Sequence, residues 1–164
     1  MRRAMILTIS DGVAAGTRVD ESGAALVQRL EELGFNVERA VVADEPNAIA
    51  GVVTDAARRV DLVISTGGTG LGPRDRTPEA LRSVLDYEVP GLGEQMRAFG
   101  RTRTPMADIS RSLAGVIGST LVVAVPGSVG GALDSLAAIE AVLEHALETL
   151  GGHTQHATKA EPAS

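Results

Sequence analysis

Cysteine is absent from this 164-residue chain, and aromatic residues are almost absent. Without cysteine the chain can form no disulfide framework, no thiolate metal site and no cysteine nucleophile. Phe35, Tyr87 and Phe99 are its only aromatic residues, which argues against base-stacking surfaces for nucleic acid. We therefore expect a hydrophobic core built from Val, Leu, Ile and Ala.

An excess of positive charge and long apolar runs are also lacking. The net charge is -6, which excludes a general basic surface for nucleic acid. No apolar run reaches the length of a membrane span, and the run after Met1-Arg2-Arg3 is too short for a signal-peptide core. We expect a cytoplasmic protein with no nucleic-acid or membrane partner. Its length predicts one domain over residues 1–151, followed by a polar, disordered tail at 152–164.

A glycine-rich stretch from Leu62 to Ala80 is the most informative part of the sequence. It opens with a short apolar run rich in β-branched residues, which is typical of a strand covered on both faces. Further on, Thr77 predicts a helix N-cap, Pro78 suits the first helical position, and Glu79 complements the helix dipole. The stretch therefore predicts a strand, a loop and a helix in succession.

The loop inside this stretch favours a binding site. Glycine allows backbone close to a ligand and presents N–H groups to an anion, although a glycine-rich loop can equally be a tight turn. Arg74 and Asp75 at its far end make the binding interpretation the more attractive one. The glycines of this loop are Gly67, Gly68, Gly70 and Gly72.

Strands and helices alternate through most of the chain. Short connections between them favour right-handed crossovers, and hence a three-layer α/β/α fold with a mostly parallel, doubly wound sheet and a small hairpin. Residues 13–17 are expected to form a loop, and the strand at 35–41 to lie near a sheet edge. Strands are predicted at 4–9, 35–41, 62–64 and in a hairpin over 115–125, and helices at 20–33, 46–60, 78–85, 90–99, 107–113 and 130–150.

Polar residues follow several of the predicted strands. Ser10-Asp11, Asp44-Glu45 and the Gly67 loop each come directly after a strand. Parallel sheets bind ligands outside the carboxyl ends of their strands, so these three groups should converge on one edge of the sheet.

Short motifs follow one another along nearly the whole chain. They are Ile9-Ser10-Asp11, Asp44-Glu45, Thr66-Gly67-Gly68-Thr69-Gly70, Pro73-Arg74-Asp75-Arg76-Thr77-Pro78-Glu79-Ala80, Pro90-Gly91-Leu92-Gly93-Glu94, Ser110-Arg111 and Pro126-Gly127-Ser128. In this order and spacing they resemble the molybdopterin-binding family of molybdenum cofactor biosynthesis. Its bacterial members are the MogA and MoaB proteins, and the same module recurs in a plant protein and in gephyrin.

The resemblance implies a function and an assembly. The function is adenylylation of molybdopterin by ATP with Mg²⁺, releasing pyrophosphate ahead of molybdate insertion. The assembly is a homotrimer, or a hexamer as in some MoaB-type members, with the molybdate-insertion protein as a further partner. The catalytic and metal-binding positions implied are Asp44 and Asp75. The implied substrate- and nucleotide-binding positions are Ser10, Asp11, Thr66, Gly67, Gly68, Thr69, Gly70, Arg74, Thr77, Glu94, Ser110, Arg111, Pro126, Gly127 and Ser128.

The residue types suit this chemistry. Nucleotidyl transfer to a phosphate needs anion-binding donors, a metal and in-line placement of two phosphates. Glycine-loop N–H groups and the hydroxyls of Thr66 and Thr69 are such donors, and carboxylates are the oxygen ligands that Mg²⁺ prefers. A phosphate nucleophile is already ionised at neutral pH, so no histidine base is required.

Each assignment also has a purely structural alternative. Asp44 could cap the second helix, and Asp75 could cap a helix or pair with Arg74. Ser10 and Asp11 could close a turn. Further structural alternatives are a helix-end pair for Ser110 and Arg111, a structural Glu94, and solvated side chains for His153 and His156.

Two other functions remain open. One is a non-catalytic, MoaB-type pterin-binding accessory protein, which gains weight because Val129 and two glycines follow Ser128 where many family members carry a Lys. The other is a nucleotide pyrophosphatase related to the competence-damage (CinA) family, although that family usually carries a further domain.

Overall fold

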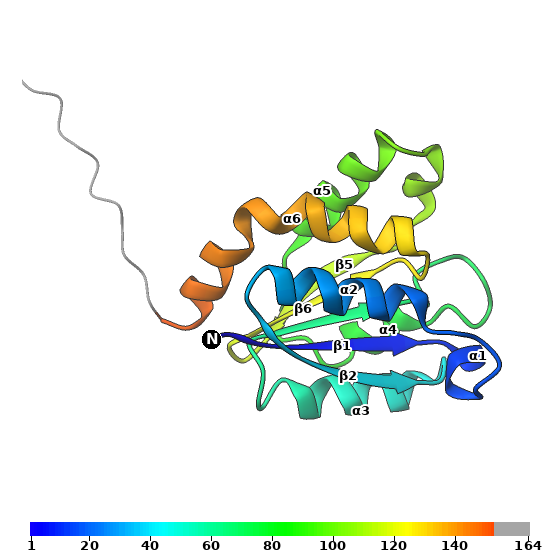
Figure 1. Cartoon of the computed structure of the whole chain (residues 1–164), viewed down its shortest axis with the longest axis horizontal. Helices are drawn as coiled ribbons and strands as arrows, with labels where there is room; N and C mark the ends of the chain where they lie inside the picture. Colours follow the sequence, from blue (N-terminus) through cyan, green and yellow to red (C-terminus); the bar gives the residue numbers. More distant parts are fainter. Residues whose placement is uncertain (153–164) are drawn as a thin grey trace, which may run out of the picture.

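The computed structural model describes residues 1–152 (Figure 1). His153, His156 and all but the first residue of the expected tail lie outside this range. The strands are β1 (Arg3–Ile9), β2 (Asn36–Val42), β3 (Leu62–Thr66), β4 (Tyr87–Glu88), β5 (Leu113–Ile117) and β6 (Thr120–Val125). The helices are α1 (Asp11–Ala14), α2 (Glu21–Glu32), α3 (Pro46–Ala56), α4 (Thr77–Arg82), α5 (Pro90–Arg101), the 3₁₀ helix η1 (Pro105–Ile109) and α6 (Val129–Leu150).

Within residues 1–152 the strands form one six-stranded sheet in the order β2-β1-β3-β6-β5-β4. β2, β1, β3 and β6 are parallel to one another. β5 pairs antiparallel with β6, and β4 pairs antiparallel with β5. Thr66 pairs with Thr8 of β1 and with Val125 of β6. The carboxyl ends of these central strands therefore lie level at one edge, as the alternating pattern predicts.

Helices cover both faces of the sheet and make three layers (Figure 1). On one face, α2, α5 and α6 pack against alternate strand residues such as Ile6, Ile64 and Val123. On the other face, α3 and α4 pack against the intervening residues, among them Leu7 and Val63. The central strands are buried on both sides, because successive side chains of a strand point to opposite faces. The three-layer α/β/α prediction is confirmed.

Most predicted elements are present, and β2 is an edge strand as expected. Gly118 has a φ of 59° in the turn between β5 and β6, where glycine is favoured. This hairpin is not a separate element, because β6 also pairs with β3 and extends the main sheet.

Three local predictions are wrong. Val13 and Ala14, predicted to begin the loop at 13–17, belong instead to the short helix α1, because the Ser10 side chain accepts a hydrogen bond from Val13 N and caps this helix. The predicted helix at 107–113 is a 3₁₀ helix ending at Ile109, and β5 begins at Leu113. Arg111 N donates to Thr69 O over 2.9 Å, and this hydrogen bond holds residues 110–112, between η1 and β5, against the glycine loop.

Thr77 is the third correction, since it is not the N-cap of α4. That position is Arg76, which makes no side-chain cap bond. Thr77 instead begins the helix, and its fully buried hydroxyl donates to Gly67 O over 2.9 Å. The threonine hydroxyl therefore closes the glycine loop instead of accepting a hydrogen bond from the N–H groups at the start of α4.

Candidate functional site

The glycine loop after β3 has a conformation that only glycine adopts easily. Gly67 and Gly68 have φ values of 107° and 68°. A Cβ on Gly67 would lie 2.2 Å from Ile9 O, and one on Gly68 would lie 2.2 Å from the Thr77 hydroxyl. The loop therefore passes against the end of β1 and the start of α4 with no room for side chains.

The tip of the loop presents a row of backbone N–H groups. Gly67 N donates to Val125 O over 3.1 Å, but the N–H groups of Gly68, Thr69 and Gly70 meet no acceptor in residues 1–152. Consecutive free N–H groups in a glycine loop form a concave donor surface for an anion.

Arg111 holds this loop in place. Its Nε donates to Gly70 O over 2.9 Å and its Nη2 to Asp75 O over 2.6 Å. Its Nη1 pairs with Glu79 of α4, and this hydrogen bond lowers the pKa of the Glu79 carboxyl. The guanidinium is thus occupied by the loop and by α4, which makes Arg111 a positioning residue.

Asp11 and Asp44 join the ends of β1 and β2. Asp11 N donates to Asp44 Oδ2 over 2.9 Å, and Asp44 N donates to Asp11 Oδ1 over 3.0 Å. Arg74 spans the same region, donating to Asp11 Oδ2 and to Glu45 Oε1, each over 3.0 Å. Asp44 does not cap α3, whose N-cap is Glu45.

Asp75 does not pair with Arg74. Its Oδ2 accepts from Gly72 N over 2.9 Å, which closes a turn within the loop. Within residues 1–152 no hydrogen bond involves the other carboxylate oxygen, Oδ1, and Asp75 lines both of the cavities described below.

The two neighbouring carboxylates Asp11 and Asp44 have opposite pKa shifts. The hydrogen bond from Arg74, followed by that from Asp44 N, lowers the pKa of Asp11. Burial raises the pKa of Asp44, and repulsion from Asp11 and Asp75 adds to the shift. Half-buried carboxylates whose charge is disfavoured by their surroundings are typical of functional sites, because a bound cation relieves the cost.

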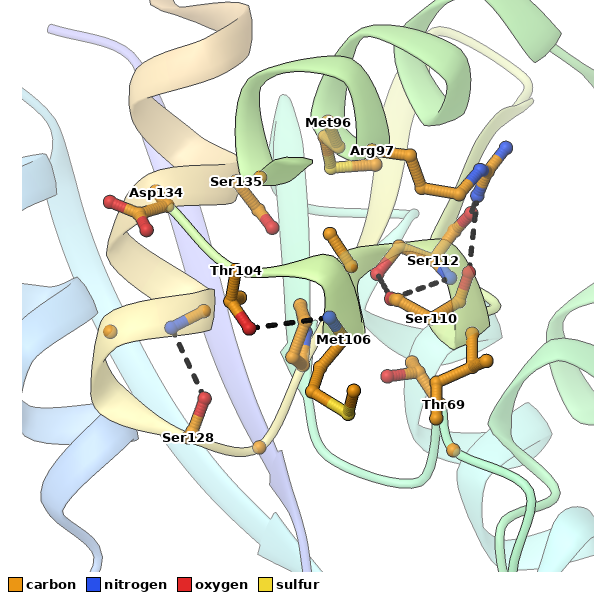
Figure 2. A pocket seen from close by; sticks show the side chains of 18 of the residues that line it. Thr69, Met96, Arg97, Thr104, Met106, Ser110, Ser112, Ser128, Asp134 and Ser135 are labelled. Carbon is orange, nitrogen blue, oxygen red and sulfur yellow. Dashed lines mark hydrogen bonds between the residues drawn. The ribbon is translucent and has the colours of Figure 1, made fainter. Parts of the chain in front are cut away.

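Two cavities of about 500 Å³ each open beside the glycine loop. The first cavity lies between the loop, α5, η1 and the start of α6 (Figure 2). The second cavity lies over the ends of β1 and β3 and the start of α2. Both are lined by Gly68, Asp75, Gly127 and Ser128, so the two cavities adjoin.

The first cavity combines apolar and hydroxyl groups. Met96 and Met106 line it together with Thr69, Ser110 and Ser135 (Figure 2). Such a mixture suits a flat heterocycle, because thioethers adapt to a ring face while a few polar groups orient its edge.

Arg97 also lines the first cavity (Figure 2). Its Nη1 donates to Ser112 O over 2.7 Å, so Arg97 ties α5 to the segment before β5.

The second cavity is more polar. Its lining includes Ser10, Ser22, Asp20 and Asp44. Thr66 lies at its base and donates to Pro126 O over 2.8 Å. This polar lining suits a charged, hydrated ligand such as a polyphosphate.

The fold brings most of the predicted site residues to these cavities. Thr77, Arg111, Asp11 and Arg74 instead bond within the loops around them, and Glu94 is exposed on α5 away from both linings. The predicted residues that line a cavity are Ser10, Asp44, Thr66, Gly67, Gly68, Thr69, Gly70, Asp75, Ser110, Pro126, Gly127 and Ser128.

Sequence reasoning missed several lining residues. Met96 follows the apolar stripe of α5, and its spacing is equally that of a core residue. Arg18 and Asp134 carried no motif signal at all. Other missed lining residues are Asp20, Arg97, Thr104, Met106, Ile109 and Ser135.

The carboxylates fit a hard cation that arrives with phosphate. Within residues 1–152, no group of three or more His, Asp or Glu residues is arranged to hold a metal ion alone. Mg²⁺ is commonly bound by one or two carboxylates together with water and substrate phosphates. Asp44 and Asp75, which line the same cavity, are a donor set of this kind.

These features are typical of a class of α/β proteins whose ligands bind at the carboxyl edge of a parallel sheet. Here two adjoining cavities lie at that edge beside the glycine loop. Residues 5–148 match the family described as a probable molybdopterin binding domain. The chain belongs to this molybdopterin-binding family of molybdenum cofactor biosynthesis.

Individual relatives agree with this membership. A molybdenum cofactor biosynthesis bifunctional protein of Chlorobaculum tepidum is 40% identical over 92% of this chain, which spans only 49% of that relative. A molybdopterin adenylyltransferase of Helicobacter pylori is 33% identical over 90% of this chain and 87% of its own length.

The fold is also shared with a solved structure. The molybdopterin biosynthesis enzyme MoaB of Thermus thermophilus is 48% identical and has a TM-score of 0.86, covering 93% of this chain and 98% of that one. Within the described part of the chain, no helix is long and apolar enough to cross a membrane.

Proposed function

We propose that this protein transfers an adenylyl group from ATP to molybdopterin. The observation that carries the proposal is the pair of adjoining cavities, which share Gly68, Asp75, Gly127 and Ser128. A transfer between two substrates needs both reacting groups in one place, and holding them there removes much of the entropic barrier. The named Helicobacter pylori relative supports the same reaction class.

In this reaction the terminal phosphate of molybdopterin attacks the α-phosphorus of ATP. A new P–O bond forms, the bond between the α-phosphorus and its bridging oxygen breaks, and pyrophosphate leaves. The free N–H groups of Gly68, Thr69 and Gly70 stabilise negative charge on the reacting phosphates. The attacking phosphate is already ionised, so no side chain has to remove a proton.

Asp44 and Asp75 are the residues proposed to hold Mg²⁺. The ion would neutralise phosphate charge and favour departure of pyrophosphate. The raised pKa of Asp44 supports this role, since a cation beside it offsets burial and the repulsion from neighbouring carboxylates.

The decisive experiment incubates the purified chain with molybdopterin, ATP and Mg²⁺ and looks for adenylylated molybdopterin by mass spectrometry. Product should form with the unmodified chain and disappear with Asp75→Asn or Asp44→Asn. Asp55→Asn is the matched control, because it removes an exposed carboxylate on α3 that, within residues 1–152, pairs only with Arg59.

The alternatives give different outcomes in the same assay. Tight molybdopterin binding without product would support a MoaB-type accessory protein. Nucleotide hydrolysis without molybdopterin would support a CinA-like pyrophosphatase.

The assembly, location and partners remain proposals that rest on the family resemblance. We propose one domain over residues 1–151 in a cytoplasmic homotrimer, or hexamer, that passes its product to a molybdate-insertion protein. Light scattering tests the assembly directly, and a monomeric mass would contradict it.

A further inference from the structure

Arg18, between α1 and α2, places a cationic side chain at the second cavity. Its side chain lines the cavity and makes no hydrogen bond or ion pair with residues 1–152. The neighbouring arginines are engaged: Arg39 pairs with Asp20, while Arg74 pairs with Asp11 and Glu45.

The backbone beneath Arg18 is held firmly. Gly12 O accepts from Thr17 N over 2.9 Å, from Arg18 N over 3.2 Å and from the Thr17 hydroxyl over 3.1 Å. Gly16 makes the turn with a φ of 75°. The base of the Arg18 side chain is therefore fixed although its tip is exposed.

Gly12 also shapes the path of the Arg18 stem. A Cβ on Gly12 would lie 2.8 Å from Arg18 Cδ and 3.1 Å from its Cγ. The stem thus lies directly on the glycine, and a side chain there would displace it. Position 12 therefore gives a way to move the guanidinium without removing it.

The side chains that line the second cavity are mostly acidic or uncharged. Its lining carries the acids Asp20, Glu21, Asp44 and Asp75, and among residues 1–152 Arg18 is the only cationic residue that lines it. The cavity wall after β6 is uncharged, being Gly127, Ser128 and Val129. A polyphosphate entering beside these carboxylates needs positive charge, and a guanidinium can hold phosphate oxygens with two hydrogen bonds.

We propose that Arg18 binds a phosphate group of the ligand in the second cavity. The inference extends the proposed function, which supplies two sources of that phosphate: the polyphosphate of ATP and the terminal phosphate of molybdopterin. Binding measurements separate the two sources and do not require turnover.

The test compares Arg18→Ala, Arg18→Lys and the control Arg58→Ala. Arg58 lies beyond the end of α3, is exposed and lines neither cavity, so its loss changes net charge equally. Calorimetry with Mg²⁺ and either ATP, pyrophosphate or molybdopterin gives the dissociation constants.

Arg18→Ala should weaken the phosphate ligand about tenfold, the usual scale for one hydrogen bond to a charged group. Arg18→Lys should recover part of this loss and Arg58→Ala should show none. A loss for ATP and pyrophosphate assigns Arg18 to the nucleotide, and a loss for molybdopterin alone assigns it to the pterin phosphate.

Gly12→Ala provides a second, independent variant. It should weaken the same ligand by displacing Arg18, and it should add nothing in the Gly12→Ala/Arg18→Ala double variant. Additive losses would show that Gly12 acts by another route and would overturn the structural basis of the inference.

Other outcomes also decide the question. Affinities within twofold of the unmodified chain for all three ligands in Arg18→Ala would overturn the inference, as would failure of the unmodified chain to bind any of them. If Arg18→Ala weakens binding as expected but the unmodified chain forms no adenylylated product, the proposed function fails while the role of Arg18 stands.

Discussion

At the scale of single residues, the carboxylates beside the glycine loop differ in what holds them. Asp11 accepts hydrogen bonds from Arg74 and from Asp44 N, so its charge is stabilised within the fold. Asp44 is half-buried beside two other carboxylates and its pKa is raised. A carboxylate whose ionised form is disfavoured by its surroundings is more typical of a ligand-binding site than of a residue that stabilises the fold.

Asp44→Asn should therefore abolish adenylyl transfer without destabilising the protein. A carboxyl whose folded pKa lies above its ordinary value of 3.8 binds a proton more tightly in the folded state than in the unfolded state. The protonated carboxyl therefore stabilises the fold fully at pH below 3.8, and this contribution is lost as the pH rises through the folded pKa. At neutral pH the ionised Asp44 thus weakens the fold, and Asn, which can still accept from Asp11 N, removes that effect. Calorimetry at pH 7 should give a melting temperature equal to or above that of the unmodified chain.

The same reasoning makes the effect depend on pH. Any advantage of Asp44→Asn in melting temperature should shrink as the pH is lowered toward the ordinary value of 3.8, where Asp44 becomes protonated. A variant that melts several degrees lower at pH 7 would show that Asp44 is mainly structural.

At the scale of elements, the glycine loop is built by contacts from three separate parts of the chain. Ile9 O at the end of β1 lies against Gly67, and the Thr77 hydroxyl at the start of α4 donates to Gly67 O. Arg111, before β5, donates to Gly70 O. Its shape therefore depends on tertiary contacts as well as on its own glycines. The two glycines with positive φ at its start, Gly67 and Gly68, are the positions least able to change.

Gly67→Ala should destabilise the protein by at least about 2 kcal/mol, because it combines a strained φ with a collision against Ile9 O. Gly51→Ala on α3 is the matched change, since a Cβ there meets nothing within 4 Å. It should stabilise by about 0.5–1 kcal/mol through helix propensity. Urea denaturation measures both, and equal effects would contradict the close approach of the loop to β1.

At the scale of the whole molecule, the parallel sheet sets the position of both cavities. β1, β3 and β6 end level with one another, so the loops that follow them meet at one edge. Residues far apart in the sequence, such as Gly68 and Ser128, thereby form a common wall between the cavities.

Because the cavities adjoin without coinciding, both substrates should bind at once. Initial rates measured at varied ATP and molybdopterin concentrations should give intersecting double-reciprocal lines, the pattern of a ternary complex. Parallel lines, which indicate a covalent enzyme intermediate, would contradict direct transfer between the two cavities.

Local patterns were enough to predict the layers, the edge position of β2 and the convergence of polar residues at one edge of the sheet. Hydrophobic periodicity and the geometry of parallel strands determine these features largely independently of individual side-chain contacts. The same patterns did not predict the N-cap of α4 or the hydrogen bonds of Thr77 and Arg111, which depend on partners distant in sequence. A threonine before Pro-Glu looks like a helix cap until Gly67 O is within reach of its hydroxyl.

The order and spacing of the motifs in the sequence are enough to identify the family and to select Asp44 and Asp75 as the candidate catalytic residues. Only the folded molecule separates the residues that line the cavities from those, such as Arg74 and Arg111, that hold the loops around them. It also brings Arg18 to the second cavity, a position that no motif marks. The reason is physical: sequence spacing determines which groups are present at the end of a strand, whereas hydrogen bonds between loops decide which of those groups remain free for a ligand.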